Sequence, residues 1–189
     1  MATIRPIERR LAARLLQPGP VTLVTSLFRS QHNVMAAGWI TPIGTDPMLI
    51  GVAIHPSRLT HELISHSEAF GLSIPTIELL NSVHRCGMET GRDRDKFLSA
   101  RLTPMDAQEL ETPLVAECVA HIECGLVERI TLTDHDLFIG EVLAASAVQE
   151  LFTDRWRVGD GSELLHHIGG DEYAALGRVY RAKLVEEEE

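Results

Sequence analysis

The sequence predicts a mainly β protein, in which an antiparallel β-barrel is flanked by helices packed on its outside. Between residues 21 and 149, short stretches rich in β-branched and apolar residues alternate with clusters of turn-forming residues. Short links of this kind join antiparallel strands, because a parallel pair needs a long crossover. Helical patterns are few and do not alternate regularly with the strands, which argues against a β-α-β architecture.

In the first part of the chain, the sequence pattern predicts one surface helix followed by three strands. Residues 1–17 place Ile4, Ile7, Leu11 and Leu15 on one helical face. The stretch Gln17-Pro18-Gly19-Pro20 ends this helix, because proline lacks a backbone donor. The strands expected next are Val21–Ser26, Val34–Thr41 and Met48–His55, separated by turn-forming residues.

The second part of the chain predicts two helices and a long hairpin. Ser57 is expected to cap a helix that runs to about His66. The remaining expected elements are a strand Phe70–Ile74, a helix Thr76–Arg85, a polar loop Gly87–Phe97, hairpin strands Glu117–Leu132 and Asp136–Gln149, and a short helix Asp171–Leu176. No repeat or linker interrupts residues 1–189, so we expect one domain with an acidic tail at 186–189.

The composition is that of a soluble globular chain with an acidic surface. With 44% hydrophobic and 23% charged residues, the 189-residue chain can bury a core. The formal net charge of −10 argues against nucleic acid or an anionic membrane as the main partner, although it allows a local basic site. We expect no membrane span and no secretion signal, because no apolar run is long enough for either. Three cysteines suit a reduced, cytoplasmic setting without a structural disulfide.

The most informative local pattern is the run from Asn33 to Pro42. Its Ala36-Ala37-Gly38 centre lets a flat ligand approach the backbone N–H and C=O groups closely. Trp39 would then form a wall beside that ligand. The alternative is that these small residues only allow a helix to pack closely on the sheet.

Two further segments carry basic and hydroxyl groups that suit a phosphate. In His55-Pro56-Ser57-Arg58-Leu59-Thr60 a strand ends, a helix begins, and a guanidinium arrives with two hydroxyls. Lys96, in the loop from Gly91 to Phe97, would add a second positive charge. The alternatives are an ordinary capped helix with Arg58 in solvent, and a loop whose arginines and aspartates pair at the surface.

The order and spacing of these motifs resemble the flavin reductase-like family, and flavoredoxins in particular. The shared motifs are N-x-M-x-x-x-W-x-T-P, P-x-R-x-T-H-E-L-I, V-H-x-C-G and G-R-D-x-D-K-F, followed by the Asp134-His135 turn and the late stretches Leu165–Gly170 and Tyr173–Gly177. The resemblance covers residues 20 to 180. It implies an antiparallel, Greek-key type FMN-binding split barrel that forms a homodimer, with FMN near the subunit interface.

The resemblance also implies the site residues. Asn33, Met35, Ala36, Trp39, Ile40 and Thr41 would line the flavin ring and ribityl chain, Arg58, Thr60 and Lys96 would hold the phosphate, and Leu59, Cys86, Gly87 and Phe97 complete the cofactor-binding set. Asp134 and His135 would stand near a nicotinamide as the catalytic pair. Ala36 replaces a threonine that is frequent in the family, and Thr133 replaces the glycine of its G-D-H turn.

These residues predict an NAD(P)H-dependent FMN reductase that passes electrons onward, with NADH or NADPH as a transient substrate. The alternative is an electron carrier that holds FMN tightly and serves a redox partner protein without efficient NAD(P)H oxidation. A metal- or haem-binding protein is a more distant alternative, because the spacing of the 9 histidines matches no common metal motif, and we expect no metal site. Thiol catalysis is not expected, because Cys86 beside His84 and Arg85 has no ordered base; the minor alternative is that Arg85 lowers the thiol pKa and gives Cys86 a redox role.

Overall fold

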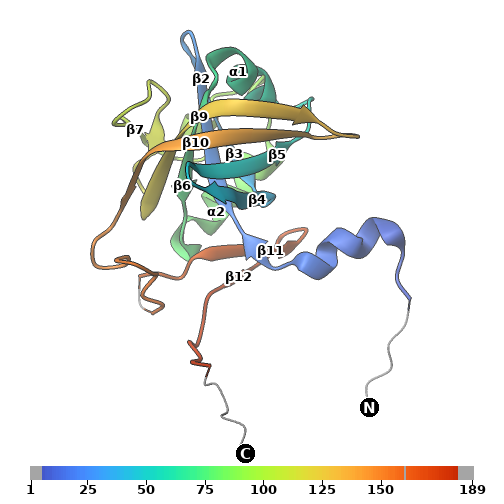
Figure 1. The fold of residues 1–189 in the computed structure, drawn as a ribbon, viewed down its shortest axis with the longest axis vertical. Coiled ribbons are helices and arrows are strands. Elements are labelled where there is room, and N and C mark those ends of the chain that lie inside the picture. Colours follow the sequence, from blue (N-terminus) through green and yellow to red (C-terminus); the bar gives the residue numbers. More distant parts are fainter. Residues whose placement is uncertain (1–5, 160, 183–189) are drawn as a thin grey trace, which may run out of the picture.

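The core of the molecule is a seven-stranded antiparallel sheet with the strand order β3-β2-β6-β9-β10-β5-β4 (Figure 1). The computed structural model describes residues 6–159 and 161–182. The sheet strands are β2 (Thr22–Phe28), β3 (Gln31–Ala37), β4 (Ile40–Thr45), β5 (Met48–Ile54), β6 (Ala69–Ile74), β9 (Ala120–Thr131) and β10 (Asp136–Ala147). This arrangement confirms the mainly β, antiparallel prediction. The consecutive strands β3 and β4 lie at opposite edges of the sheet, so the barrel is split between them.

The prediction of one continuous strand at Val34–Thr41 is wrong. The chain leaves β3 after Ala37 and enters β4 at Ile40, so Gly38 and Trp39 form a corner between opposite edges. Glycine and alanine weaken a strand interior and favour such corners. The break places Trp39 at the end of the sheet, where its side chain is 51% exposed.

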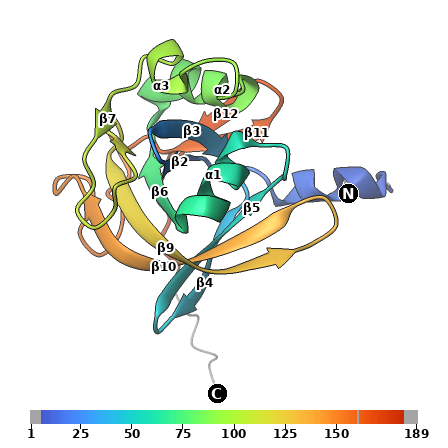
Figure 2. The ribbon, with the colours of Figure 1, turned by 90° about the horizontal axis from the view of Figure 1, so that it is seen from above.

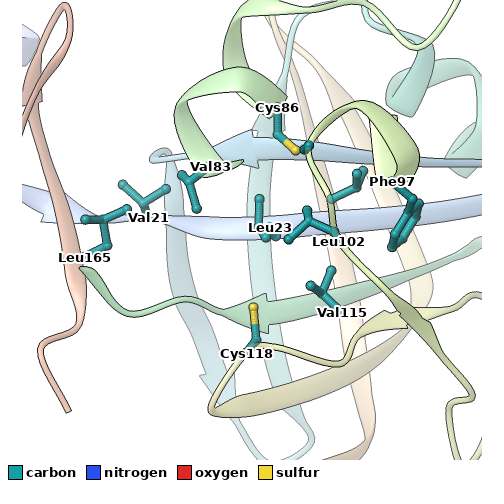
Figure 3. Close-up of a cluster of buried hydrophobic side chains, with 11 residues drawn as sticks. Val21, Leu23, Val83, Cys86, Phe97, Leu102, Val115, Cys118 and Leu165 are labelled. Carbon is teal, nitrogen blue, oxygen red and sulfur yellow. The ribbon is translucent and has the colours of Figure 1, made fainter. Parts of the chain in front are cut away.

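The sheet is buried on both faces, because β2 contributes side chains to two separate cores. Leu23 belongs to the cluster in Figure 3, which packs between the sheet and the helices and contains Val83, Phe97 and Val115. Val24, on the opposite face, belongs to a second cluster within the barrel around Phe70 and Phe138. Alternate residues of one strand thus serve two cores, as the period of two requires.

One glycine allows the barrel interior to close. Gly140 lies in β10, where a Cβ atom would meet the Phe70 ring at 2.6 Å and the Cys124 Cβ at 2.8 Å. A larger residue would force the ring out of its place in the barrel core. The ladder between β9 and β10 also shifts register beside Ile139 and Gly140, which adds local twist.

Two helices pack on the outside of the sheet, as the sequence predicts, whereas the helix after β5 contributes Ile64 to the cluster within the barrel. Helix α1 (Leu59–Ser67) packs on β2 and β3, and α2 (Leu80–Met88) and α3 (Lys96–Ser99) pack on β3. A short 3-10 helix, η2 (Ile77–Leu79), leads into α2. Figure 2 shows α2 and α3 on one side, with the β9–β10 pair curving round the other.

The predicted cap of α1 is wrong. Arg58, not Ser57, occupies the N-cap position, and no side chain caps the helix. Ser57 instead bonds to the His55 ring, at 2.8 Å between Oγ and Nδ1. The Ser57 hydroxyl therefore bonds to the His55 ring and does not cap the helix N-terminus.

The predicted helix at Asp171–Leu176 is also wrong. Strand β12 (Glu172–Ala175) forms a hairpin with β11 (Leu165–Gly169), and β11 pairs with β1 (Gly19–Pro20). The alanines favour a helix locally, but Gly170 adopts a φ of +59° and turns the chain back on itself. Cross-strand pairing with His166 and His167 then overrides the local preference. A further small sheet pairs β7 (Pro104–Met105) with β8 (Leu114–Val115).

The N-terminal helix exists, but in a different form. It is the 3-10 helix η1 (Arg9–Leu16), which projects from the body in both views, with Leu15 and Leu16 exposed (Figures 1 and 2). Ile4 and the acidic tail at 186–189 lie outside the described residues. Among the helices of the described chain, none has both the length and the apolar character to cross a bilayer.

Candidate functional site

Two adjoining pockets lie where β3, β5, α1 and the loop before α3 meet. We call the first the Trp39 pocket; it has a volume of about 280 Å³ and is lined by Met35, Gly38, Trp39, His55, Arg58 and His135, among others. The second, the Lys96 pocket, has a volume of about 240 Å³ and is lined by Asn33, Arg58, Thr60, Cys86, Gly91 and Lys96, among others. Met35 and Arg58 line both pockets, so the two adjoin at these residues.

Aromatic rings form one wall of the Trp39 pocket. The Trp39 and His135 rings lie with centroids 4.8 Å apart, and the His135 and His55 rings lie 5.3 Å apart in an edge-to-face arrangement. Ala36, Ala37 and Gly38 line the pocket from the end of β3. Small residues facing a wall of rings leave a slot that suits a flat, aromatic ligand.

The Asp134-His135 pair lies in the turn between β9 and β10. His135 Nδ1 lies 3.0 Å from Asp134 Oδ1, and because a carboxylate only accepts, the imidazole donates. This hydrogen bond holds the pKa of Asp134 below its usual value. His135 lines the Trp39 pocket, whereas Asp134 is exposed and orients His135 from outside it.

The same hairpin is attached to helix α1. His61 Nε2 lies 2.9 Å from Asp136 Oδ2, and both side chains are largely buried. Arg129 approaches the same carboxylate oxygen at 3.7 Å. Asp136 directly follows His135, so this contact fixes the hairpin wall relative to the helix that carries Arg58.

Buried polar side chains form the inner end of the Lys96 pocket. Asn33 donates from Nδ2 to Thr60 Oγ1 at 2.7 Å, and both residues are fully or almost fully buried. The side-chain amide oxygen of Asn33, Oδ1, has no hydrogen-bond partner within the described chain. A Cβ at Gly91 would meet this oxygen, so the oxygen is packed against the Gly91 backbone and is not open to the pocket.

Lys96 brings a cation to this pocket. Its side chain is 4% exposed, and Nζ donates a 2.9 Å hydrogen bond to the Cys86 carbonyl. Burial, with a smaller contribution from Arg58, lowers the pKa of Lys96 to about 8. An ammonium in such a place gains most from an anion, because the anion offsets the cost of burying the charge.

Helix α1 points its N-terminus at the same pocket. The helix has nine residues, no side chain caps it, and its first residues, Leu59 and Thr60, line the pocket beside Arg58. Uncapped N–H groups and the positive end of the helix dipole favour an anion. Arg58, Lys96 and the helix N-terminus therefore converge on one anion-binding position.

The structure brings together most of the predicted site residues. Asn33, Met35, Ala36, Trp39, Arg58, Leu59, Thr60, Cys86, Gly87, Lys96 and His135 all line one or both pockets.

Three predicted ligand residues lie elsewhere. Ile40 follows Trp39 at the start of β4 and lines a different, apolar pocket. Thr41 is exposed and donates to the Pro42 carbonyl. Phe97 is 2% exposed, packs in the outer core and meets His32 edge to face. Trp39 lies in the corner between β3 and β4, whereas Ile40 begins β4, so the two side chains do not line the same pocket.

The predicted lowering of the Cys86 pKa is wrong. The thiol is almost fully buried, and this burial raises its pKa to about 11, although Lys96 and Arg85 act weakly in the opposite direction. Cys86, Cys118 and Cys124 are all free and buried. A buried thiol with a raised pKa carries little thiolate, so the structure gives Cys86 a packing role.

Sequence reasoning missed several contributors to the site, among them His55, Gly91 and Glu89. His55 lines the Trp39 pocket. Its position two residues before Ser57 was the sequence feature that could have identified it as a site residue. Gly91 lies so close to Asn33 that a Cβ would clash with its side chain. Glu89 lines the Lys96 pocket but is held by Ser99 at 2.7 Å and Arg85 at 3.3 Å. No sequence spacing connects these residues, because they meet only through the fold.

Two other features bear on alternative functions. A larger pocket of about 600 Å³, here called the Trp156 pocket, is lined mainly by apolar residues that include Ile40, Leu72, Phe152, Trp156 and Leu176. Within residues 6–159 and 161–182, no group of three or more His, Cys, Asp or Glu side chains is arranged to hold a metal ion.

Comparison with known proteins agrees with this geometry. The family described as "Flavin reductase like domain" matches residues 14–185. The uncharacterised protein YddH of Escherichia coli K12 is 34% identical over 184 residues, covering 94% of this chain and 97% of YddH.

Solved structures agree as well. The flavoredoxin of Desulfovibrio vulgaris has a TM-score of 0.80 at 29% identity, covering 96% and 98% of the two chains. An FMN-binding domain of a flavin reductases-like enzyme from Shewanella baltica has a TM-score of 0.79 at 29% identity, covering 94% and 96%. With the family match over almost the whole chain, the protein belongs to the flavin reductase-like family.

Proposed function

We propose that the protein binds FMN across the Trp39 and Lys96 pockets and reduces it with NADH or NADPH. The observation that carries this proposal is Arg58, which lines both pockets. A flavin ring in one pocket and a phosphate in the other would be joined past this residue. The Shewanella baltica domain is named as FMN-binding, and a ferric-chelate reductase (NAD(P)H) of Archaeoglobus fulgidus is 27% identical over 135 residues, which supports the proposal.

The Lys96 pocket fits the phosphate end of FMN. Arg58 offers a guanidinium fork, and two N–H bonds of the Lys96 ammonium have no hydrogen-bond partner within the described chain. The uncapped N-terminus of α1 adds backbone donors. The buried hydrogen bond from Asn33 to Thr60 would hold β3 and α1 on either side of the ribityl chain.

The Trp39 pocket fits the ring end. Bound flavin supplies the hydride and electron chemistry itself. The protein holds the ring beside the small residues of β3, and it keeps Trp39 and His135 at the pocket wall, where a second ring can meet the flavin. A nicotinamide would enter beside Asp134 and His135, with His135 contacting it directly and Asp134 orienting the imidazole.

Anaerobic mixing with NADH or NADPH tests this function. Bleaching of the visible flavin absorbance is the expected result. The likeness to flavoredoxins favours a second function, that of an electron carrier which holds FMN tightly and exchanges electrons with a redox partner protein. FMN that stays oxidised with both nucleotides but is reduced by dithionite would exclude the reductase and leave the carrier.

A homodimer is part of the proposal. The Trp156 pocket is an apolar hollow between the barrel and the segment after β10, and a side chain of a second copy inserted there would bury apolar area. Light scattering at micromolar concentration should give twice the chain mass of 20.9 kDa. A mass of one chain would contradict the dimer. The three free, buried thiols support placing the protein in the reducing cytoplasm.

A further inference from the structure

His55 is a pocket residue whose hydrogen bonds determine which ring nitrogen carries the proton. The backbone N–H of Ser57 donates to His55 Nδ1 at 3.1 Å. A backbone N–H only donates, so Nδ1 must be the acceptor in this contact. The Ser57 hydroxyl, 2.8 Å from the same nitrogen, must then donate to it as well.

The proton of the neutral His55 ring therefore lies on Nε2. Within the described chain, Nε2 of His55 has no hydrogen-bond partner, and the side chain lines the Trp39 pocket. His135 has the opposite arrangement, because its Nδ1–H donates to Asp134 and leaves Nε2 free of that bond. Two histidines with centroids 5.3 Å apart thus present different chemistry to one pocket.

We propose that His55 supplies a permanent Nε2–H donor, which binds the carbonyl oxygen of a planar substrate ring in the Trp39 pocket. This inference rests on the proposed function, in which a substrate ring meets the flavin there. The carbonyl oxygen belongs either to the carboxamide of a nicotinamide or to a quinone-type electron acceptor. His55 is then a residue that orients the substrate, beside His135.

The protonation pattern can be measured without any turnover. In protein labelled with ¹⁵N-histidine, long-range ¹H–¹⁵N spectra distinguish a protonated from an unprotonated ring nitrogen, and the His55→Phe variant assigns the signal. We expect His55 to show an unprotonated Nδ1 and a protonated Nε2. Because the backbone donor remains, Ser57→Ala should leave this pattern unchanged. A protonated Nδ1 in His55 would overturn the inference.

Ligand titration tests the donor itself. Chemical shifts of the Trp39 indole report binding of nicotinamide and of 3-methylpyridine, which has the same ring without the carbonyl oxygen. Loss of one hydrogen bond predicts about three- to tenfold weaker nicotinamide binding in His55→Phe, with 3-methylpyridine binding unchanged. His66→Phe, on the exposed side of α1, is the matched control. Equal affinities of wild type and His55→Phe for nicotinamide and also for menadione, a quinone, would refute the donor role.

Half-reaction kinetics identify the source of the carbonyl oxygen. In His55→Phe, a raised half-saturation concentration for NADH assigns nicotinamide as the ligand, and a raised value for menadione assigns a quinone acceptor. If neither changes, the inference fails. If wild-type flavin reacts with neither reagent, the proposed function fails instead, and the spectra and the nicotinamide titration still decide the role of His55.

Discussion

The side-chain amide of Asn33 on β3 donates a 2.7 Å hydrogen bond to the hydroxyl of Thr60 on α1. Both residues are buried, so the bond joins the strand and the helix that form the two sides of the site. The change Thr60→Val keeps the side-chain shape but leaves the Asn33 amide without an acceptor. We expect the free energy of unfolding to fall by about 1–3 kcal/mol, measured by urea denaturation. Thr131→Val, at the exposed end of β9, is the control. An equal loss in both variants would show that the buried bond has no special role.

Removal of both cations from the Lys96 pocket should release the cofactor. Each charged hydrogen bond contributes about 1.5–3 kcal/mol, so Arg58→Ala with Lys96→Ala is expected to weaken FMN binding at least about a hundredfold. Fluorescence titration with FMN measures this change. The exposed pair Arg92→Ala with Arg155→Ala removes the same net charge elsewhere and should bind normally. Unchanged affinity in the Arg58/Lys96 variant would mean that the phosphate binds at another place.

FMN affinity should depend on pH through Lys96. Its pKa is lowered to about 8 by burial, whereas a bound phosphate favours the charged form and raises that pKa. Above pH 8, binding then takes up one proton, so the dissociation constant should rise about tenfold per pH unit until the pKa of the complex is reached. Isothermal titration at several pH values measures this slope, and Lys96→Met should remove it.

The same group affects the stability of the protein without ligand in the opposite direction. The unfolded chain holds the Lys96 proton up to the ordinary pKa of 10.5, but the folded chain loses it near 8. Between these values the unfolded state binds more protons, so the free energy of unfolding should rise with pH. A slope that persists in Lys96→Met would assign the effect to another group.

Gly91 is predicted to tolerate no side chain. A Cβ atom there would lie within 2.9 Å of both Asn33 Cγ and Leu59 Cδ2. Gly91→Ala should therefore cost about 1–3 kcal/mol of stability by overpacking and should displace Asn33 from its contact with Thr60. Thermal unfolding measures the cost. Gly177→Ala, where nothing lies within 4 Å, is the matched control. Wild-type stability in Gly91→Ala would show that the loop moves away freely.

The cysteines should react slowly in the native protein. Burial raises the pKa of Cys86 to about 11 and that of Cys124 to about 12, and it also raises the pKa of Cys118. A thiol reagent at pH 8 is expected to label three cysteines rapidly only after unfolding in guanidinium. Fast labelling of one native cysteine, absent in Cys86→Ser, would restore the redox hypothesis for Cys86.

The sequence predicted the strands well, because each contributes alternating side chains to defined cores. Leu23 and Val24 illustrate this, since neighbouring residues of β2 fill different clusters. The errors occur where tertiary contacts decide the conformation. The segment Glu172–Ala175 has local helical preference but pairs with β11, and Ser57 bonds to His55 instead of capping α1.

The site was predictable to the extent that motifs are continuous in sequence. Arg58, Thr60 and Lys96 stand in recognisable motifs, and the fold brings them together. The direction of a side chain was not predictable by the same means. Phe97 follows Lys96 yet faces the outer core, and Ile40 follows Trp39 yet lines the Trp156 pocket. A motif identifies neighbours in the chain, whereas the pleat and the helix turn decide which of them face a ligand.

Arg58 lines both pockets, and this limits how a two-ended ligand is recognised. Once one end is bound, the other is held beside its own pocket at a high effective concentration, so the second contact forms as an intramolecular event. Riboflavin and inorganic phosphate should be tested separately. The binding free energy of each should be much less than half of the binding free energy of FMN. The protein would thereby favour the intact molecule over its fragments, without a separate contact for each.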